Sequence, residues 1–132
     1  MHRLSSGGPG LRLALFAFLS LFLPAAGFGN IGHHSLFIKT DGSLWGMGAN
    51  WVGGLGDGTT TARTSPIQIL PSDVSQVSHG SGHTLFIKTD GSLWGMGSNA
   101  FGQLGDGTNT DRHVPIQIVP SGVTACKAGW RH

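Results

Sequence analysis

Apolar residues after the first thirty positions fall into short runs, and each run ends at turn residues. Residues 85–88 read Leu-Phe-Ile-Lys, the pair Asp90-Gly91 follows, and residues 92–96 return with apolar side chains on both faces. This pattern predicts two short strands joined as a hairpin. The Asp-Gly pair is expected to supply the positive φ angles that a two-residue hairpin turn requires. No stretch with helical periodicity follows, so we expect an all-β chain.

The chain repeats itself at an offset of 49 residues. Residues 34–82 return as residues 83–131, and 31 of the 49 aligned positions are identical. The identities are concentrated in two blocks, H-x-L-F-I-K-T-D-G-S-L-W-G-M-G-x-N and G-x-L-G-D-G-T continuing to P-I-Q-I-x-P-S. Gly129 and His132 fit the start of a third copy. The chain is therefore an array of one structural unit.

Each repeat carries two strand candidates besides the hairpin. They are residues 66–70 and 74–78 in the first repeat, and residues 115–119 and 123–127 in the second. Four short strands per unit favour blades of a β-propeller, which are four-stranded antiparallel sheets, over a β-helix or a plain sandwich. Two repeats cannot close a ring, so we expect an incomplete ring that belongs to a longer protein. The predicted units are a first repeat at residues 28–82, a second at residues 83–131 and a truncated third at residue 132.

Residues 1–27 have the features of a secretory signal peptide. Arg3 and Arg12 precede an apolar run at residues 13–23, and small residues lead to a cleavage site expected just before Phe28. The run is shorter than the roughly 20 apolar residues of a membrane-spanning helix, so no stable membrane span is expected after cleavage. An uncleaved anchor is the alternative. The mature protein is predicted to be secreted, with a periplasmic or extracellular location.

Removal of this segment leaves a chain without net charge. The formal charge of +2 equals the two arginines of the signal segment, and the remainder has six basic and six acidic side chains. Because no basic stripe is available to neutralise phosphates, nucleic acid is not an expected partner. The single cysteine, Cys126, takes the repeat position of Val77 and is interpreted as a small apolar residue.

The residues shared by both repeats are interpreted as structural. Each recurring glycine marks a backbone position that a side chain would obstruct. Trp45 and Trp94 are expected to fill the space between neighbouring blades. The repeated histidine is expected to hydrogen-bond a turn in each blade rather than to act in catalysis. The signature consists of His34, Asp41, Gly42, Trp45, Gly46, Gly48, Asn50, Gly56, Asp57 and Gly58 in the first repeat, and of His83, Asp90, Gly91, Trp94, Gly95, Gly97, Asn99, Gly105, Asp106 and Gly107 in the second.

The block at residues 80–108, G-x-x-H-T-L-F-I-K-T-D-G-S-L-W-G-M-G-S-N-A-F-G-Q-L-G-D-G-T, resembles the repeat of the regulator of chromosome condensation family. The resemblance extends from His34 onward and implies a β-propeller, typically of about seven blades. It also implies two kinds of role. One is nucleotide exchange on a small nuclear GTPase, and the other is inhibition or recognition at protein surfaces by exported bacterial members. The first copy departs from the pattern in reading W-V-G-G-L at residues 51–55.

Motifs that would carry chemistry lack the context that the chemistry requires. The G-x-G-x-x-G of residues 27–32 has no preceding strand and no following helix. His79 and His83 have no third ligand for zinc. The aspartate-rich turn at residues 106–111 loses its last carboxylate in the first repeat, and the chain has no glutamate to complete a calcium loop. No G-x-S-x-G nucleophile elbow is present. We therefore expect no catalytic residue, metal site or cofactor, and no enzyme.

Positions that differ between the repeats are the candidates for binding, because propellers present variable loops on a fixed frame. Trp51 and Phe101 are the strongest candidates for interface anchors. The alternative is that both rings pack between blades. We expect a secreted, non-catalytic propeller that binds a protein partner and that self-associates through open blade edges. Alternatives are the opening region of a larger secreted enzyme or cell-surface protein and, more weakly, guanine-nucleotide exchange or carbohydrate binding.

Overall fold

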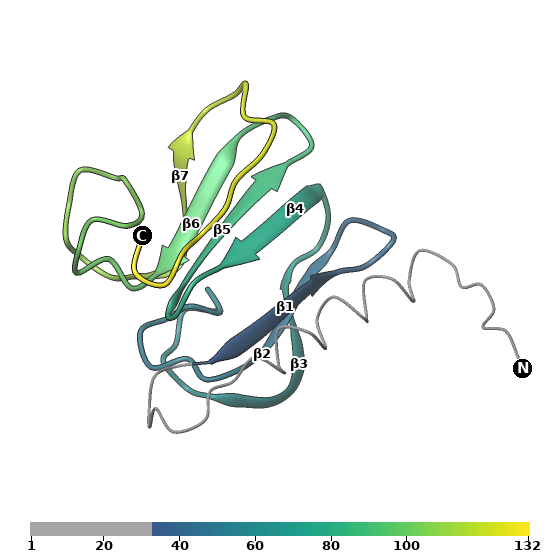
Figure 1. Cartoon of the computed structure of the whole chain (residues 1–132). Helices are drawn as coiled ribbons and strands as arrows, with labels where there is room; N and C mark the ends of the chain where they lie inside the picture. The colour runs from purple at the N-terminus through teal and green to yellow at the C-terminus, as the bar shows by residue number, and fades with distance from the viewer. Residues whose placement is uncertain (1–32) are drawn as a thin grey trace, which may run out of the picture.

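The computed structural model describes residues 33–132, which form seven short strands and no helix (Figure 1). The signal segment and the first residues of the first repeat lie outside the described residues. The strands are β1 (His34–Ile38), β2 (Leu44–Gly48), β3 (Arg63–Leu70), β4 (Val74–His79), β5 (His83–Lys88), β6 (Leu93–Gly97) and β7 (Arg112–Val119). The predicted all-β class is confirmed.

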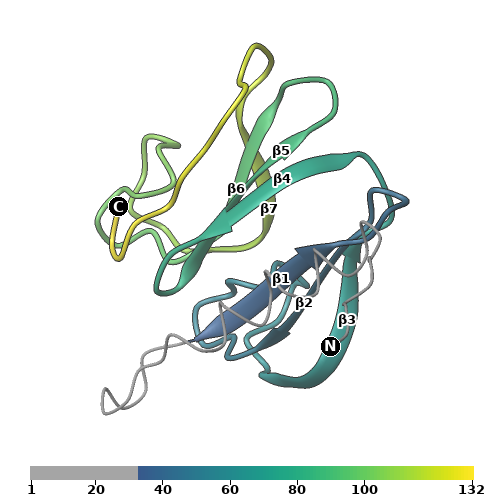
Figure 2. The same cartoon turned by 45° about the vertical axis from the view of Figure 1, so that its right-hand side comes forward.

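The strands form two antiparallel sheets, one of three strands in the order β1-β2-β3 and one of four in the order β4-β5-β6-β7. The sheets lie next to each other with β1 facing β4 (Figures 1 and 2). This is the arrangement of successive propeller blades. The sheets do not divide the chain where the sequence repeat does, because β4 precedes His83 and is the first strand of the second sheet.

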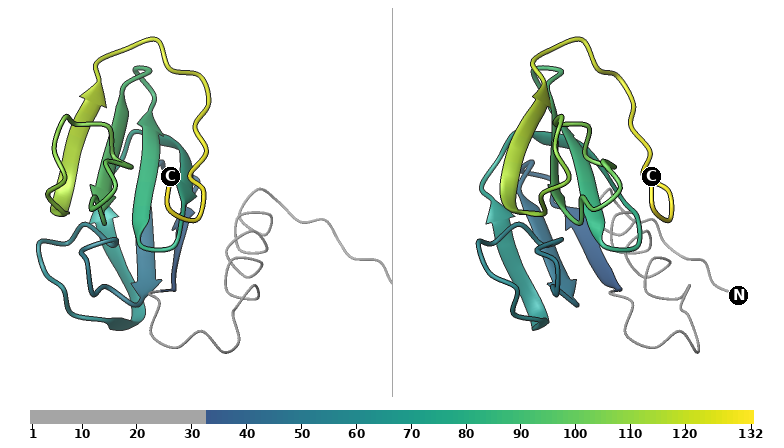
Figure 3. Two further views of the ribbon diagram at one scale, coloured as in Figure 1. Left: turned by 60° about the vertical axis from the view of Figure 1, so that its left-hand side comes forward. Right: turned by 90° about the vertical axis from the view of Figure 1, so that its left-hand side faces the viewer.

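The strand predicted at residues 123–127 does not form. Residues after β7 run back along the second sheet without a strand ladder (Figure 3). Two side chains of β4 contact this segment: Gln76 Nε2 donates to the Thr124 carbonyl at 2.9 Å, and Ala128 N donates to Ser78 Oγ at 3.0 Å. The residues that would pair with it, by analogy with β4 and β5, begin at His132. The segment therefore has no partner strand within the described residues.

The hairpin turns differ from the predicted two-residue form. Gly42 has a φ of 85° and Gly91 a φ of 84°, whereas neither aspartate of the Asp-Gly pairs has a positive φ. Gly42 N donates to the Lys39 carbonyl, and Lys39 N donates to the Ser43 carbonyl, so the connection is a longer turn that ends in a left-handed glycine. Asp41 instead accepts hydrogen bonds from the backbone and hydroxyl of Ser43. The aspartate fixes the turn through its side chain.

Both signature tryptophans are half-buried. Trp94 packs against the core shared by the two sheets, as expected for a ring between blades, whereas Trp45 lies on its own hairpin and is not part of that core. Trp45 lies opposite Phe37 in the β1–β2 register, and the two rings stack with centroids 6.5 Å apart. The Lys39 ammonium covers the ring at 3.8 Å from its centroid. Phe86, Trp94 and Lys88 repeat this arrangement in the second sheet. Cross-strand pairing therefore places each indole on its own sheet.

The hydrophobic core is one cluster shared by both sheets. Leu36 and Leu44 from the first sheet contact a group from the second that comprises Val74, Phe86 and Met96. All five side chains are almost completely buried. Neither sheet covers its apolar face alone, so the contact between the sheets supplies most of the core.

A buried hydrogen-bond relay joins the two sheets. His34 Nε2 lies 2.8 Å from Thr84 Oγ1, and Thr84 donates its hydroxyl hydrogen to the Gly54 carbonyl at 2.9 Å. Because the threonine has only one hydroxyl hydrogen, His34 is the donor and carries its proton on Nε2. The histidine therefore reaches the turn at Gly54 through a threonine of the next sheet.

The loop between β2 and β3 also packs on the second sheet. Gly58 N donates to the His113 carbonyl at 2.8 Å. Gly97 has a φ of 101°, and a Cβ there would lie 3.0 Å from Gly54 Cα and would overlap the Gly82 carbonyl oxygen. The close approach of Gly54 and Gly97 therefore requires glycine at position 97.

Replacement of Thr84 by valine is expected to destabilise the protein by about 2 to 3 kcal/mol, because it leaves the His34 N–H and the Gly54 carbonyl buried without partners. The free energy of unfolding in urea, followed by tryptophan fluorescence, measures the loss. Thr89→Val is the matched control, since Thr89 is exposed in the β5–β6 turn. Equal stability of Thr84→Val and Thr89→Val would contradict the relay.

Stability is expected to fall as the pH falls from about 6.5 toward 3. Burial lowers the pKa of His34 to about 3, and the neighbouring rings of His79, His83 and His33 add to the effect. A group whose pKa is lower in the folded state binds fewer protons there, so its contribution is complete above the unfolded pKa and is lost below it. The loss should reach a few kcal/mol.

The urea concentration at the midpoint of unfolding, measured between pH 7 and pH 4.5, reports mainly on histidine titration, because the carboxylates titrate mainly below this range. His34→Gln keeps a side-chain N–H without an imidazole and should flatten the profile. An unchanged profile in His34→Gln would assign the pH dependence to other groups.

Candidate functional site

Two equivalent loops, one per sheet, are built around a buried asparagine. In the first, Asn50 Nδ2 donates to Asp57 Oδ1 at 3.1 Å and to the carbonyls of Thr59 and Thr61, while its Oδ1 accepts from Leu55 N at 2.9 Å. In the second loop, Asn99 makes the same bonds. Its Nδ2 donates to Asp106 Oδ1 and to the carbonyls of Thr108 and Thr110, and its Oδ1 accepts from Leu104 N. The amide therefore replaces backbone pairing inside each loop and fixes its shape.

The aspartates of these loops take part in hydrogen bonds and ion pairs within their own loop. Asp106 accepts from the backbone and hydroxyl of Thr108 and forms an ion pair with Arg112 at 2.8 Å. Hydrogen bonds from Thr108 lower the pKa of Asp106, with Arg112 adding to the effect and burial opposing it. Asp57 and Arg63 repeat the pair in the first loop. Among residues 33–132 no group of three His, Cys, Asp or Glu side chains is placed to bind a metal ion.

The predicted anchors Trp51 and Phe101 are both exposed, at 57% and 68% of their surface. Neither ring is buried between the two sheets of this structure. The two rings come from the loops of different sheets and line the same hollow, of about 350 Å³. The other lining residues are Val52, Ser81, Gly82, Ser98, Gln103, Trp130 and Arg131. We call this hollow the aromatic groove.

A third exposed aromatic, Trp130, completes the aromatic groove, with 51% of its surface exposed. Trp130 is one of the positions that differ between the repeats, but it was not among the predicted anchors. The available signal was the replacement of Ser81 by a tryptophan at the equivalent position of the next repeat. Ser81 N donates to the Trp130 carbonyl at 3.2 Å, which holds the end of the chain against the loop after β4.

Side chains that vary between the repeats hold the Phe101 loop in place. Gln103 stands where the first repeat has Gly54, and its Oε1 accepts from Phe101 N at 2.9 Å. Its Nε2 lies 3.3 Å from Ser98 Oγ. The Arg131 guanidinium lies 5.6 Å from the centroid of the Phe101 ring. Such cation–π contacts add a modest attraction at an exposed site.

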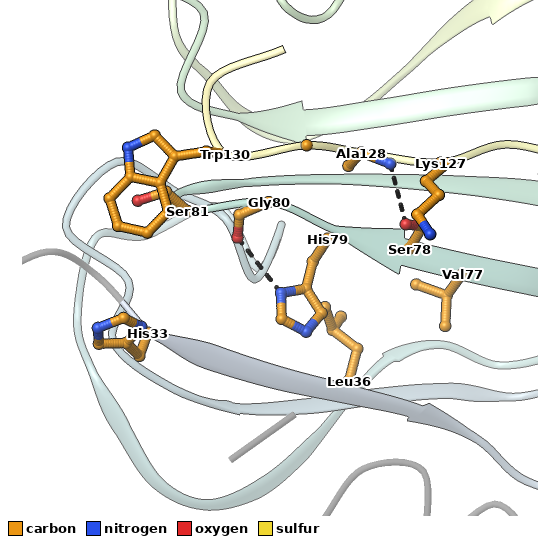
Figure 4. Close-up of a pocket in the computed structure, with 11 residues that line it drawn as sticks. His33, Leu36, Val77, Ser78, His79, Gly80, Ser81, Lys127, Ala128 and Trp130 are labelled. Carbon is orange, nitrogen blue, oxygen red and sulfur yellow. Dashed lines mark hydrogen bonds between the residues drawn. The ribbon is translucent and has the colours of Figure 1, made fainter. Parts of the chain in front are cut away.

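A second cavity of about 490 Å³ adjoins the aromatic groove, and Ser81 and Trp130 line both. Figure 4 shows its lining residues, with Leu36 on β1, Val77 on β4 and Lys127 on the segment after β7. His79 projects into it, and its Nδ1 lies 3.3 Å from the Gly80 carbonyl. Burial lowers the pKa of His79, with the Gly80 carbonyl opposing the change.

Aromatic and aliphatic side chains line these two hollows, together with amide and hydroxyl groups. The imidazoles of His33 and His79 and the cationic groups of Lys127 and Arg131 also belong to the lining. No helix in the described part of the chain has the length and apolar character needed to cross a membrane.

Comparison with known proteins relates both sheets to one family. Residues 41–87 and 90–132 match the family model described as the regulator of chromosome condensation (RCC1) repeat, and residues 74–103 match a second model of the same description. No curated protein matches the sequence.

Solved structures share the fold. Human WBSCR16 is 30% identical over 67% of this chain and 24% of its own, with a TM-score of 0.60. Prp20p from Saccharomyces cerevisiae, described with its binding properties to Gsp1p and histones, is 22% identical over 73% of this chain and 27% of its own, also at 0.60. Yeast RCC1 (Prp20) bound to Kap60 is 24% identical over 66% of this chain and 23% of its own, with a TM-score of 0.58.

This chain therefore spans about a quarter of the length of these structures. The predicted resemblance is confirmed over both sheets, and the chain belongs to the regulator of chromosome condensation (RCC1) repeat family.

Proposed function

We propose that this chain is part of a secreted, non-catalytic propeller that binds a protein partner through the aromatic groove. One observation carries the proposal: three aromatic side chains, each more than half exposed, converge on one hollow from the two loops and the segment after β7. Tryptophan and other aromatic residues dominate binding energy at protein interfaces. An exposed cluster of this kind is typical of an interaction site.

The surroundings of the aromatic groove favour a protein over a nucleic acid. Arg131 is the only charged side chain among the described residues that line it, whereas nucleic-acid sites gather several basic side chains. Exposed tryptophans also serve carbohydrate binding, but the groove-lining polar groups are few and Gln103 is already engaged by its own loop. Peptide-like surfaces, with apolar side chains and backbone polar groups, fit such a lining better.

Nucleotide exchange and a larger secreted enzyme are the alternatives. Prp20p from Saccharomyces cerevisiae has binding properties to Gsp1p and histones, which are properties of that protein. The predicted signal peptide would keep this chain away from a nuclear GTPase. Because the chain spans about a quarter of the related structures, a catalytic module elsewhere in a longer protein is compatible with a binding role for these repeats.

Truncation of both predicted anchors should abolish partner binding without unfolding the protein. In the variant Trp51→Ala/Phe101→Ala, the partner loses two aromatic contacts, each worth about 2 kcal/mol or more at a hot spot. Immobilised wild-type chain, the double variant and Val114→Ala are compared for retained proteins from an extracellular fraction, and affinities are then measured with the purified partner. Val114 is 53% exposed and does not line the aromatic groove, so Val114→Ala is the matched control.

A partner retained equally by wild type and by Trp51→Ala/Phe101→Ala would place the binding surface elsewhere. Retention of soluble oligosaccharides in place of proteins would favour the carbohydrate alternative.

Export is tested by expressing the full chain in a secreting host. We expect the secreted product to begin at Phe28, as determined by mass spectrometry, because small residues precede that position. Replacement of Leu15 and Leu19 by arginine in the apolar run should keep the chain inside the cell. A product that retains Met1 in the membrane fraction would establish the anchor alternative.

A further inference from the structure

The aromatic groove carries hydrogen-bond donors that the protein itself does not use. The indole N–H groups of Trp51 and Trp130 have no acceptor among the described residues. The Arg131 guanidinium forms no ion pair within residues 33–132 and contacts only the Phe101 ring. A partner that displaces water from these donors must supply acceptors in its place, because a desolvated N–H without a partner costs free energy.

The acceptors of the aromatic groove, by contrast, already have donors from the protein. Gln103 Oε1 accepts from Phe101 N at 2.9 Å, the Gly82 carbonyl from Ser98 N at 2.9 Å, and the Trp130 carbonyl from Ser81 N at 3.2 Å. The serine hydroxyls of the lining can act as donors or as acceptors and do not change this balance. The groove therefore favours a partner that has many acceptors and few N–H or O–H donors.

The charge of the aromatic groove is positive and is held at one place. Arg131 is the single charged side chain among the described residues that line it. Its guanidinium lies 5.6 Å from the centroid of the Phe101 ring, and such stacking leaves the N–H groups at the guanidinium edge available. A carboxylate is the complementary group, because it can accept two parallel hydrogen bonds from a guanidinium.

Proline has the chemistry that the rings and the free donors require. Its residue combines an apolar ring with a carbonyl acceptor and has no backbone N–H. Proline-rich segments adopt the extended polyproline II helix, which has no internal hydrogen bonds and docks in grooves lined by aromatic side chains. A saccharide or a β-strand brings donors of its own and would leave part of them without acceptors here. The volume of about 350 Å³ suits a short segment rather than a whole domain.

We propose that the aromatic groove binds a short, proline-rich segment of the partner that also carries an acidic side chain. The proline rings pack on Trp51, Phe101 and Trp130, the carbonyls of the segment accept from the two free indole N–H groups, and the carboxylate binds Arg131. This proposal rests on the proposed function, since it names the chemistry of the partner that the same groove recognises.

The probe for this proposal is a decapeptide of three Pro-Pro-Asp units followed by proline, titrated into the full chain labelled with ¹⁵N. The indole N–H signals of Trp51 and Trp130 should shift, because these groups gain acceptors, with a dissociation constant below about 1 mM. The signals of Trp45 and Trp94 should stay, since these indoles already donate to Ser43 Oγ and Ser92 Oγ, each at 2.8 Å. The variants Trp51→Phe and Trp130→Phe assign the signals.

Matched peptides separate the contribution of the charge from that of the rings. A peptide with asparagine in place of aspartate should bind about threefold to fivefold more weakly, as expected for one exposed ion pair. A peptide with glycine in place of proline keeps the charge and should give no indole shifts at the same concentration, because it lacks the rings and the preformed extended conformation.

The variant Arg131→Gln tests the role of the cation. It should remove the difference in affinity between the aspartate and asparagine peptides. Lys127→Gln is the matched control, because Lys127 is an exposed cation of the same segment that does not line the aromatic groove, and it should preserve the difference. An equal difference in wild type and in Arg131→Gln would show that the carboxylate binds elsewhere and would overturn the proposal.

Two other outcomes would overturn it. One is the absence of shifts at Trp51 and Trp130 with the aspartate peptide at about 5 mM, which is above the expected dissociation constant. The other is a lower dissociation constant for a thymidine decanucleotide or for cellohexaose than for the peptide at the same indole signals. If a protein partner still loses binding in Trp51→Ala/Phe101→Ala, either outcome refutes the proline-rich segment and leaves the proposed function intact.

Discussion

The buried relay from His34 through Thr84 to Gly54 is the interaction on which the arrangement of the two sheets depends. Each sheet has an apolar face that it cannot cover alone. Because the hydrophobic effect is non-directional, burial of these faces would be favourable in many relative positions of the two sheets. The relay is directional and allows one placement, because the threonine hydroxyl must accept from the histidine and donate to the loop carbonyl at once. The shared core supplies attraction, and the relay supplies register.

The loops depend on this register in turn. Asn50 and Asn99 give both loops the same internal hydrogen bonds, so the loops are rigid copies on neighbouring sheets. Sequence differences between the repeats therefore change the side chains that the loops expose and leave the loop backbones alike. Trp51 and Phe101 are not equivalent positions, yet they face one hollow because the two loops are displaced by one blade. Shared geometry with altered side chains is how a repeat protein acquires a specific surface.

Much of the fold could be predicted from the sequence, because the repeat and the turn residues report local and periodic constraints. Trp51 and Phe101 were singled out because they vary on a fixed frame, and both are exposed in the structure, while their role as anchors stays a prediction. What escaped prediction depends on contacts between repeats. The partner of His34 is Thr84, fifty residues away, and the pattern of one repeat does not contain it.

Other differences have local causes. The hairpin turn was misjudged because Asp-Gly suits several turn types, and the flanking hydrogen bonds of Lys39 and Gly42 decide among them. Trp45 and Trp94 have the same cross-strand position, opposite Phe37 and Phe86, but only Trp94 has a neighbouring sheet within the described residues to pack against. Residues 123–127 have strand-like composition, but a strand also requires a partner, and propensity alone does not supply one.

The segment after β7 helps to form the aromatic groove. Trp130, two residues after Ala128, is the third ring of that groove. Ser81 N binds the Trp130 carbonyl, so the position of the ring depends on how the whole segment lies against β4. The aromatic groove therefore belongs to the junction between repeats rather than to one repeat, because its three rings come from the two loops and from the segment after β7.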